Sequence, residues 1–171
     1  MKRIACVVIA ILTTSGVAAA EGEKVTLSWS PIHLVLPVVE VEVEYNLAPN
    51  LGAGLILGAG RVTSTDGTVT ATAYEVGGQF NYYFMRPFSG LHGGVEAVYL
   101  TVGDVEQDSS VTANGLTVGP YVGYKVQTAI GFAFIAQLGV QYLAVKAESS
   151  TAMASQKELA PLLNLNIGWS F

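Results

Sequence analysis

Cysteine, basic residues and long apolar runs are all scarce in this chain of 171 residues. The single cysteine is Cys6, inside a leader that we expect to be removed, so disulfide and thiol chemistry are excluded from the rest of the chain. Charged residues make up only 12% of the sequence. No segment after the leader has the roughly 20 uninterrupted apolar residues that a transmembrane helix needs.

The first 20 residues have the organisation of a secretory signal. Lys2 and Arg3 precede an apolar run, and three alanines before residue 21 supply the small residues that a signal peptidase requires. We therefore expect residues 1–20 to be cleaved and residues 21–171 to form one domain. Removing Lys2 and Arg3 leaves 6 of the 8 basic residues against 13 acidic ones and changes the net charge from -5 to -7, which disfavours a nucleic-acid partner.

Beyond residue 37 the apolar residues recur at every second position, as in VVEVEVEY at 38–45. This period predicts strands with one apolar and one polar face. Seven clear strands are expected around residues 39–45, 51–59, 74–84, 91–99, 116–124, 132–142 and 163–171. The weaker segment Val25 to His33 is expected to be an eighth strand, although Pro31 and Pro37 interrupt its ladder.

The connections between these strands alternate in length. NLAPN, FMRPFSG and KVQTA are short, whereas TSTDGTVT, GDVEQDSSVTAN and KAESSTAMASQKE are longer and polar. An even strand number with alternating short turns and long loops is typical of outer-membrane barrels. The predicted fold class is all-β: a closed antiparallel up-and-down transmembrane β-barrel of eight strands.

The apolar faces favour lipid on the outside over a soluble barrel. Apart from Arg61 near a strand end, they carry no charge, and aromatic residues gather near their ends as in interfacial girdles. The lipid-interface candidates are Arg61, Tyr45, Tyr82, Tyr99, Tyr124, Tyr142 and Trp169. The alternative is a secreted soluble ligand-binding β-barrel, in which the apolar set would line the interior.

The last ten residues, LLNLNIGWSF, resemble the carboxy-terminal assembly signal of bacterial outer-membrane proteins, with matching positions at Leu163, Leu165, Ile167, Trp169 and Phe171. In length and layout, residues 21–171 resemble the small eight-stranded outer-membrane barrels of the OmpA and OmpX type, without matching one member. The resemblance implies a Gram-negative outer-membrane location, with periplasmic termini and extracellular longer loops. It also implies a monomer, with outer-membrane lipid, lipopolysaccharide and the outer-membrane assembly machinery as partners.

The polar face is expected to line the lumen. Its candidates are Glu40, Glu42, Glu44, Glu75, Glu96, His92, Lys125, Gln137 and Gln141. Folding back at NLAPN should place the first three glutamates opposite Gly58, Ile56 and Gly54. We interpret the lumen as structural, with the carboxylates hydrogen-bonded to amides, tyrosine and Lys125, because eight strands enclose little more than their own side chains. The alternative is a narrow cation-preferring pore.

A catalytic role is not predicted. The closest enzymatic alternative is a lipid A-modifying enzyme, which would need serine and histidine near the bilayer rim. The only histidines are His33 and His92; His92 precedes two glycines, and His33 lies near Ser28 and Ser30 in the least regular segment. The sequence predicts no catalytic residue, no cofactor and no metal site, since paired histidines and calcium-loop spacings are missing. A role at the envelope, structural or interactive, is the expected function.

Overall fold

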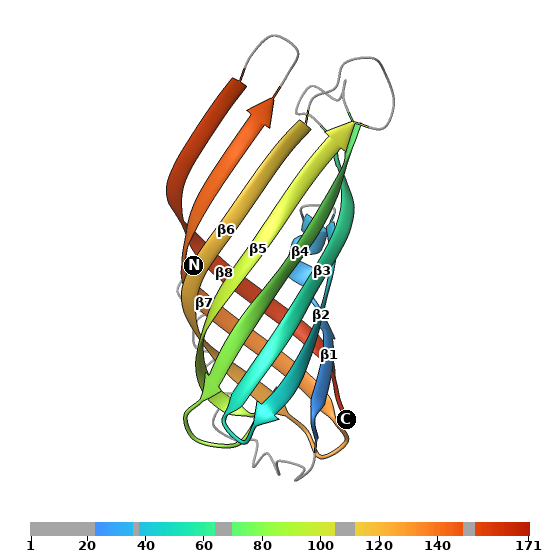
Figure 1. Ribbon diagram of the computed structural model, residues 1–171. Helices are drawn as coiled ribbons and strands as arrows, with labels where there is room; N and C mark the ends of the chain where they lie inside the picture. The colour runs from blue at the N-terminus through green and yellow to red at the C-terminus, as the bar shows by residue number, and fades with distance from the viewer. Residues whose placement is uncertain (1–22, 36–37, 64–69, 105–111, 149–152) are drawn as a thin grey trace, which may run out of the picture.

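The computed structural model describes residues 23–35, 38–63, 70–104, 112–148 and 153–171 (Figure 1). Within these ranges, eight antiparallel strands close into a barrel in which each strand pairs with its neighbours in chain order. The elements are β1 Val25–Trp29, the 3-10 helix η1 Pro31–Val35, β2 Val38–Ala48, β3 Leu51–Thr63, β4 Thr70–Tyr83, β5 Gly90–Asp104, β6 Thr112–Gln127, β7 Phe132–Glu148 and β8 Met153–Ser170. The all-β class, closure and strand number predicted from the sequence are confirmed.

Alternation along each strand decides which side chains enter the barrel. On β2 the glutamates at 40, 42 and 44 are buried, whereas Val39 and Val43 are exposed. The β-branched valines suit a pleated strand, because their restricted side chains pack well on its surface. A shift of one residue in register would exchange the two faces, so this alternation also fixes the pairing of β2 with β3.

The strands are strongly staggered around the barrel. Ile167 of β8 pairs with Trp29 of β1, and the register followed through β2 to β7 returns to β8 at Lys157. The return point, 157 against 167, lies ten residues earlier on the same strand. Such a stagger tilts the strands, and with eight strands it leaves an interior that side chains can nearly fill.

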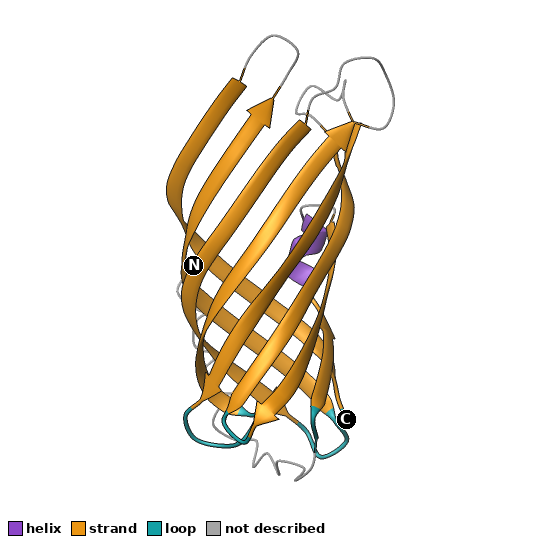
Figure 2. Ribbon diagram, in the orientation of Figure 1, coloured by secondary structure: helices purple, strands orange, loops and turns teal. Residues whose placement is uncertain are grey.

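The first strand is shorter than the sequence predicted. β1 ends at Trp29, and the expected strand continuation to His33 is wrong, because Pro31 to Val35 form η1 instead. Proline has no backbone N–H for the ladder, and its fixed φ suits the first turn of a helix. The 3-10 helix contacts β2 and β8 and lies within the outline of the barrel (Figure 2).

The strands near the longer loops extend further than expected. β7 continues to Glu148 and β8 begins at Met153, and these two residues pair with each other. Most of the segment KAESSTAMASQKE is therefore strand, and only residues 149–152 lie between the two described ends. The polar composition that predicted a loop is also compatible with a ladder whose side chains contact water on both faces. The other two longer connections lie largely outside the described residues.

The barrel has a polar interior and an apolar exterior. Among the described residues, 17 polar or charged side chains are buried against 9 hydrophobic ones, while 32 large hydrophobic side chains are exposed. A domain folded in water shows the opposite preference, with apolar residues inside. Within the described ranges, no helix is both long and apolar enough to cross a bilayer.

The two ends of the described chain meet at the β1–β8 seam. The backbone N–H of Phe171 donates to the Val25 carbonyl at 2.8 Å, and the Phe171 carbonyl accepts from Lys24 N at 2.6 Å. The terminal residue thus continues the ladder that closes the barrel.

Candidate functional site

The lumen is organised in rows that run across three strands. Glu40, Glu42 and Glu44 pair with Gly58, Ile56 and Gly54 of β3, which confirms the predicted register. On the far side of β3, Gly58 pairs with Glu75 and Gly54 with Gln79. Because glycine has no side chain, the polar groups of β2 and β4 can meet directly above these two positions.

The lower half of the lumen, nearer the short turns, is closed around Lys125. Its Nζ donates to Glu44 Oε2 at 2.9 Å and to Thr26 Oγ1 at 2.7 Å, and the residue is 0% exposed. The Phe88 ring lies against the ammonium group, with 3.4 Å from Nζ to the ring centroid. Phe88 occupies the left-handed region with φ of 55°, a conformation that non-glycine residues rarely adopt. This ion pair and ring lie in the lumen near the short turns.

A network of side-chain hydrogen bonds continues from this ion pair. Tyr83 and Asn81 donate to Glu44 Oε1 at 2.7 and 2.8 Å. Glu42 accepts from Gln79, and from Asn166 Nδ2 at 2.9 Å. Each of these two carboxylates therefore has several donors, as buried charges require.

Tyr121 and His92 extend the network toward β6 and β7. The Tyr121 hydroxyl lies 2.8 Å from Gln79 Oε1 and 2.6 Å from Asn81 Oδ1, two acceptors between which its single proton is shared. His92 is fully buried: its Nδ1 lies 3.3 Å from the Gly90 carbonyl, and its Nε2 lies 3.4 Å from Gln137 Nε2. This arrangement holds the imidazole between backbone and amide groups.

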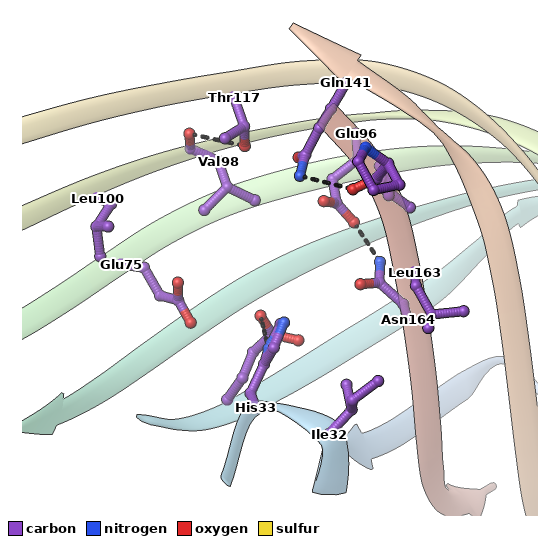
Figure 3. A pocket seen from close by; sticks show the side chains of 13 residues that line it. Ile32, His33, Glu75, Glu96, Val98, Leu100, Thr117, Gln141, Leu163 and Asn164 are labelled. Carbon is purple, nitrogen blue, oxygen red and sulfur yellow. Dashed lines mark hydrogen bonds and ion pairs between the residues drawn. The ribbon is translucent and has the colours of Figure 1, made fainter. Parts of the chain in front are cut away.

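A cavity of about 460 Å³ lies above this network, toward the longer loops. Its wall includes Glu40, Glu75 and Glu96, and His33 of η1 projects into it (Figure 3). Asn164 Nδ2 donates to Glu96 Oε2 at 2.9 Å. None of the described residues lining the cavity is lysine or arginine, so its electrostatic character is acidic.

His33 is the only titratable cation among the described residues of this wall. Its Nδ1 lies 2.7 Å from Glu40 Oε2. This contact with the Glu40 side chain raises the pKa of His33, and burial opposes the rise without cancelling it. The acidic wall thus favours positive charge on His33 next to Glu40.

The structure brings most of the predicted lumen residues into these two regions. The network below the cavity contains Glu42, Glu44, His92, Lys125 and Gln137, all of them buried. Glu40 and Glu96 are buried at the cavity, and Glu75 and Gln141 line it with partial exposure. The predicted partners of the glutamates, namely amides, tyrosine and Lys125, are the partners found for Glu42 and Glu44.

The sequence interpretation missed several contributors, among them Thr26, Tyr83, Phe88 and His33. In the sequence, Tyr83 lies between Tyr82 and Phe84, whose side chains point outward. Its inward direction follows only from the alternation of side chains along β4. Phe88 belongs to a turn, where no periodicity predicts a direction. His33 was expected at the end of the weak first strand and instead enters the lumen from η1.

The candidates for contact with lipid lie on the outer face. The exposed fractions are between 41% and 53% for Tyr45, Tyr82, Tyr99, Tyr124, Tyr142 and Trp169, and Arg61 is also exposed. The five positions of the carboxy-terminal motif occupy the outward face of β8 and the residue after it: Leu163, Leu165, Ile167, Trp169 and Phe171. Residues 1–20, the expected signal, lie outside the described residues.

Comparisons of the chain with protein-family models, with curated proteins and with solved structures found no match.

Proposed function

We propose that this protein is an integral outer-membrane β-barrel that has a structural or interactive role at the envelope and performs no catalysis. The observation that carries the proposal is the inverted distribution of side chains. Exposed leucine, valine and aromatic residues cover the outside, while carboxylates, amides and a lysine are buried inside. Apolar surface of this extent is unfavourable in water and favourable against lipid.

The spacing of the aromatic residues supports this environment. Tyr74 and Tyr82 both point outward on β4 and are eight residues apart. At about 3.3 Å per residue they are separated by roughly 26 Å along the strand. With a tilt of about 40°, the height between them is roughly 20 Å, close to the apolar band of outer-membrane barrels at about 25 Å.

Closure of the barrel near the short turns, where β1 pairs with β8, supports the same environment, because hydrocarbon offers no hydrogen-bond partner for an open strand edge. β1 pairs with β8 only between Ile167 and Ser170, so β8 has no β1 partner from Met153 to Asn166. The segment that follows β1 covers part of this edge: Ser30 Oγ donates to the Leu165 carbonyl at 3.3 Å, and η1 contacts β8. We place the short turns and both termini in the periplasm and the longer loops outside. We propose that the protein functions as a monomer.

The lower lumen favours a closed barrel over a cation-preferring pore. A fully buried Lys125 is paired with Glu44, and the amide and tyrosine network above them leaves these groups mutually bonded. Opening a path for ions would break the Lys125–Glu44 pair. Breaking a buried ion pair is costly, because each charge loses its partner and no water takes that partner's place. A structural lumen is therefore the proposed role of the acidic interior.

The partners that we propose follow from this location. The carboxy-terminal strand would be recognised by the outer-membrane assembly machinery, and lipid and lipopolysaccharide would surround the barrel. Arg61, exposed near the long-loop end of β3, is placed to contact lipopolysaccharide phosphate.

Fractionation combined with gel mobility tests the proposal. After expression in a Gram-negative host, we expect the protein in the outer-membrane fraction, released only by detergent, with unboiled and boiled samples migrating differently. Release in the soluble periplasmic fraction without a mobility difference would instead support the soluble ligand-binding barrel. Mass spectrometry of lipid A from the same cells should show no modification; a modified lipid A would support the enzymatic alternative.

A further inference from the structure

Three potential metal ligands from three different elements converge at the cavity. His33 lies on η1, Glu40 on β2 and Glu75 on β4, and one ligand atom from each lies within 4.8 Å of the other two. Figure 3 shows His33 and Glu75 projecting into the same space. The residues are far apart in sequence, so ligand spacing along the chain gave no signal of this cluster.

The backbone around the cluster is arranged so that these side chains meet. Glu40 and Glu75 both pair with Gly58, one from each side, and a side chain at 58 would overlap the Glu75 carboxylate. The start of η1 is held by Ser30, whose N–H donates to the Glu40 carbonyl at 3.1 Å. Gly58 supplies the space, and Ser30 fixes the helix that carries His33 next to Glu40.

Two buried atoms of the cluster lack the hydrogen bonds that buried polar groups normally have, although one of them has an ion-pair contact. His33 Nδ1 and Glu75 Oε1 are shielded from solvent and have no hydrogen-bond partner. His33 Nδ1 has one polar neighbour, Glu40 Oε2 at 2.7 Å, and the two form an ion pair when the imidazole is protonated. Buried orphan atoms of this kind require an explanation, and a bound ion is one of the few available.

The charge of the cavity favours the same explanation. Glu40 is 6% and Glu96 7% exposed, Glu75 adds a third carboxylate, and the described wall has no lysine or arginine. Carboxylates removed from water need a counter-charge. A divalent cation would neutralise two of the three carboxylates and would bind both His33 Nδ1 and Glu75 Oε1.

The types of ligand indicate which cation fits. An imidazole with two carboxylates is a donor set for zinc and related transition metals, whereas calcium and magnesium prefer oxygen ligands alone. Tetrahedral zinc with bonds of about 2.1 Å places its ligand atoms about 3.4 Å apart, which small side-chain rotations within the present cluster would reach. The cavity leaves the fourth coordination position open to water or a small ligand.

We propose that His33, Glu40 and Glu75 form a binding site for a divalent transition-metal cation of the zinc type, with the fourth position open to the cavity. The inference rests on the barrel interior and not on the membrane location. A soluble barrel with the same interior would bind zinc equally well, so failure of one proposal leaves the other standing.

Zinc titration of the purified, folded full chain tests this site. Isothermal calorimetry should show one zinc ion per chain, and magnesium or calcium in excess should not displace it. Cobalt added in place of zinc should give the visible absorption bands of a tetrahedral centre. We expect Glu75→Gln and His33→Asn each to weaken zinc binding by at least about tenfold. Loss of a residue that only hydrogen-bonds to a metal ligand already costs about tenfold or more, and these two residues are proposed as ligands.

Glu158→Gln is the matched control, because Glu158 is an exposed carboxylate on β8, outside the cavity. Its zinc affinity should equal that of the unmodified chain, and circular dichroism should show that all variants retain the strand content. The proposal is overturned if the folded unmodified chain binds no zinc. It is also overturned if zinc binds with an affinity that Glu75→Gln and His33→Asn leave unchanged, or that Glu158→Gln lowers as much.

Discussion

Lys125 Nζ lies 2.9 Å from Glu44 Oε2 in the lower lumen, and the two side chains are 0% and 1% exposed. Neither charge reaches solvent, so each depends on the other and on the polar groups around the pair. The ion pair joins β6 to β2 across the interior, which no hydrogen-bonded ladder does.

Removing one member of this pair should destabilise the barrel strongly. Lys125→Met leaves Glu44 buried without its counter-charge, a change that typically costs about 3–5 kcal/mol. We expect this loss in the free energy of unfolding, measured by urea titration. The double variant Lys125→Met with Glu44→Gln should recover most of it, because the remaining side chains are neutral.

The exposed Lys157 provides the control for that experiment. Lys157→Met should change the free energy of unfolding by no more than about 0.5 kcal/mol. An equal loss in Lys157→Met, or no loss in Lys125→Met, would contradict the role assigned to the buried pair.

The closed lumen predicts that the barrel does not conduct ions. In planar bilayers, we expect no single-channel steps at any applied voltage from the unmodified chain, and none from Glu42→Gln. Stepwise currents that select cations and that decrease in Glu42→Gln would show that the acidic row lines a pore.

A substitution at Gly58 changes the geometry of the proposed zinc-type site without removing any of its ligands. In Gly58→Ala the new methyl group overlaps the Glu75 side chain, which is long enough to rotate away without moving the strand. We therefore expect a folded barrel with zinc affinity lowered by about tenfold. Gly115→Ala is the control, since the nearest atom to its added carbon lies 3.8 Å away and its zinc affinity should be unchanged.

The outer face should not tolerate charge. Leu57 is 49% exposed and lies near the middle of β3. Against lipid, Leu57→Arg should lower the free energy of unfolding by about 2–4 kcal/mol, because the guanidinium must enter hydrocarbon. Against water the same change would be nearly neutral. Unfolding measured in lipid vesicles distinguishes these results, with Leu57→Met as the control of similar size and no charge.

Much of the fold follows from the period of two in the sequence. The glutamates at 40, 42 and 44 alternate with valines, and that alternation predicts two different faces and, with the turn NLAPN, the pairing with β3. The choice of the glutamate face as the inner one rests on the absence of charge and the aromatic ends of the apolar faces. The number of strands and their antiparallel order follow from the apolar face of every clear strand and from the alternation of short turns with longer loops.

The interior contacts could not be predicted in the same way. Whether Lys125 meets Glu44 or Glu42 depends on the stagger of the whole barrel, which is the sum of eight pairings. The position of His33 depends on the end of β1, where two prolines allow either an irregular strand or a helical turn. The cluster of His33, Glu40 and Glu75 can therefore be identified only from the three-dimensional arrangement of the closed barrel.

The environment of the two tryptophans tests the central claim most directly. Trp29 and Trp169 are the only tryptophans in the sequence, and both lie on the outer face with exposed fractions of 41% and 43%. In vesicles of lipid with brominated acyl chains, we expect strong quenching of the tryptophan fluorescence and little quenching by aqueous iodide. Quenching by iodide with no effect of the brominated chains would contradict a lipid-facing barrel.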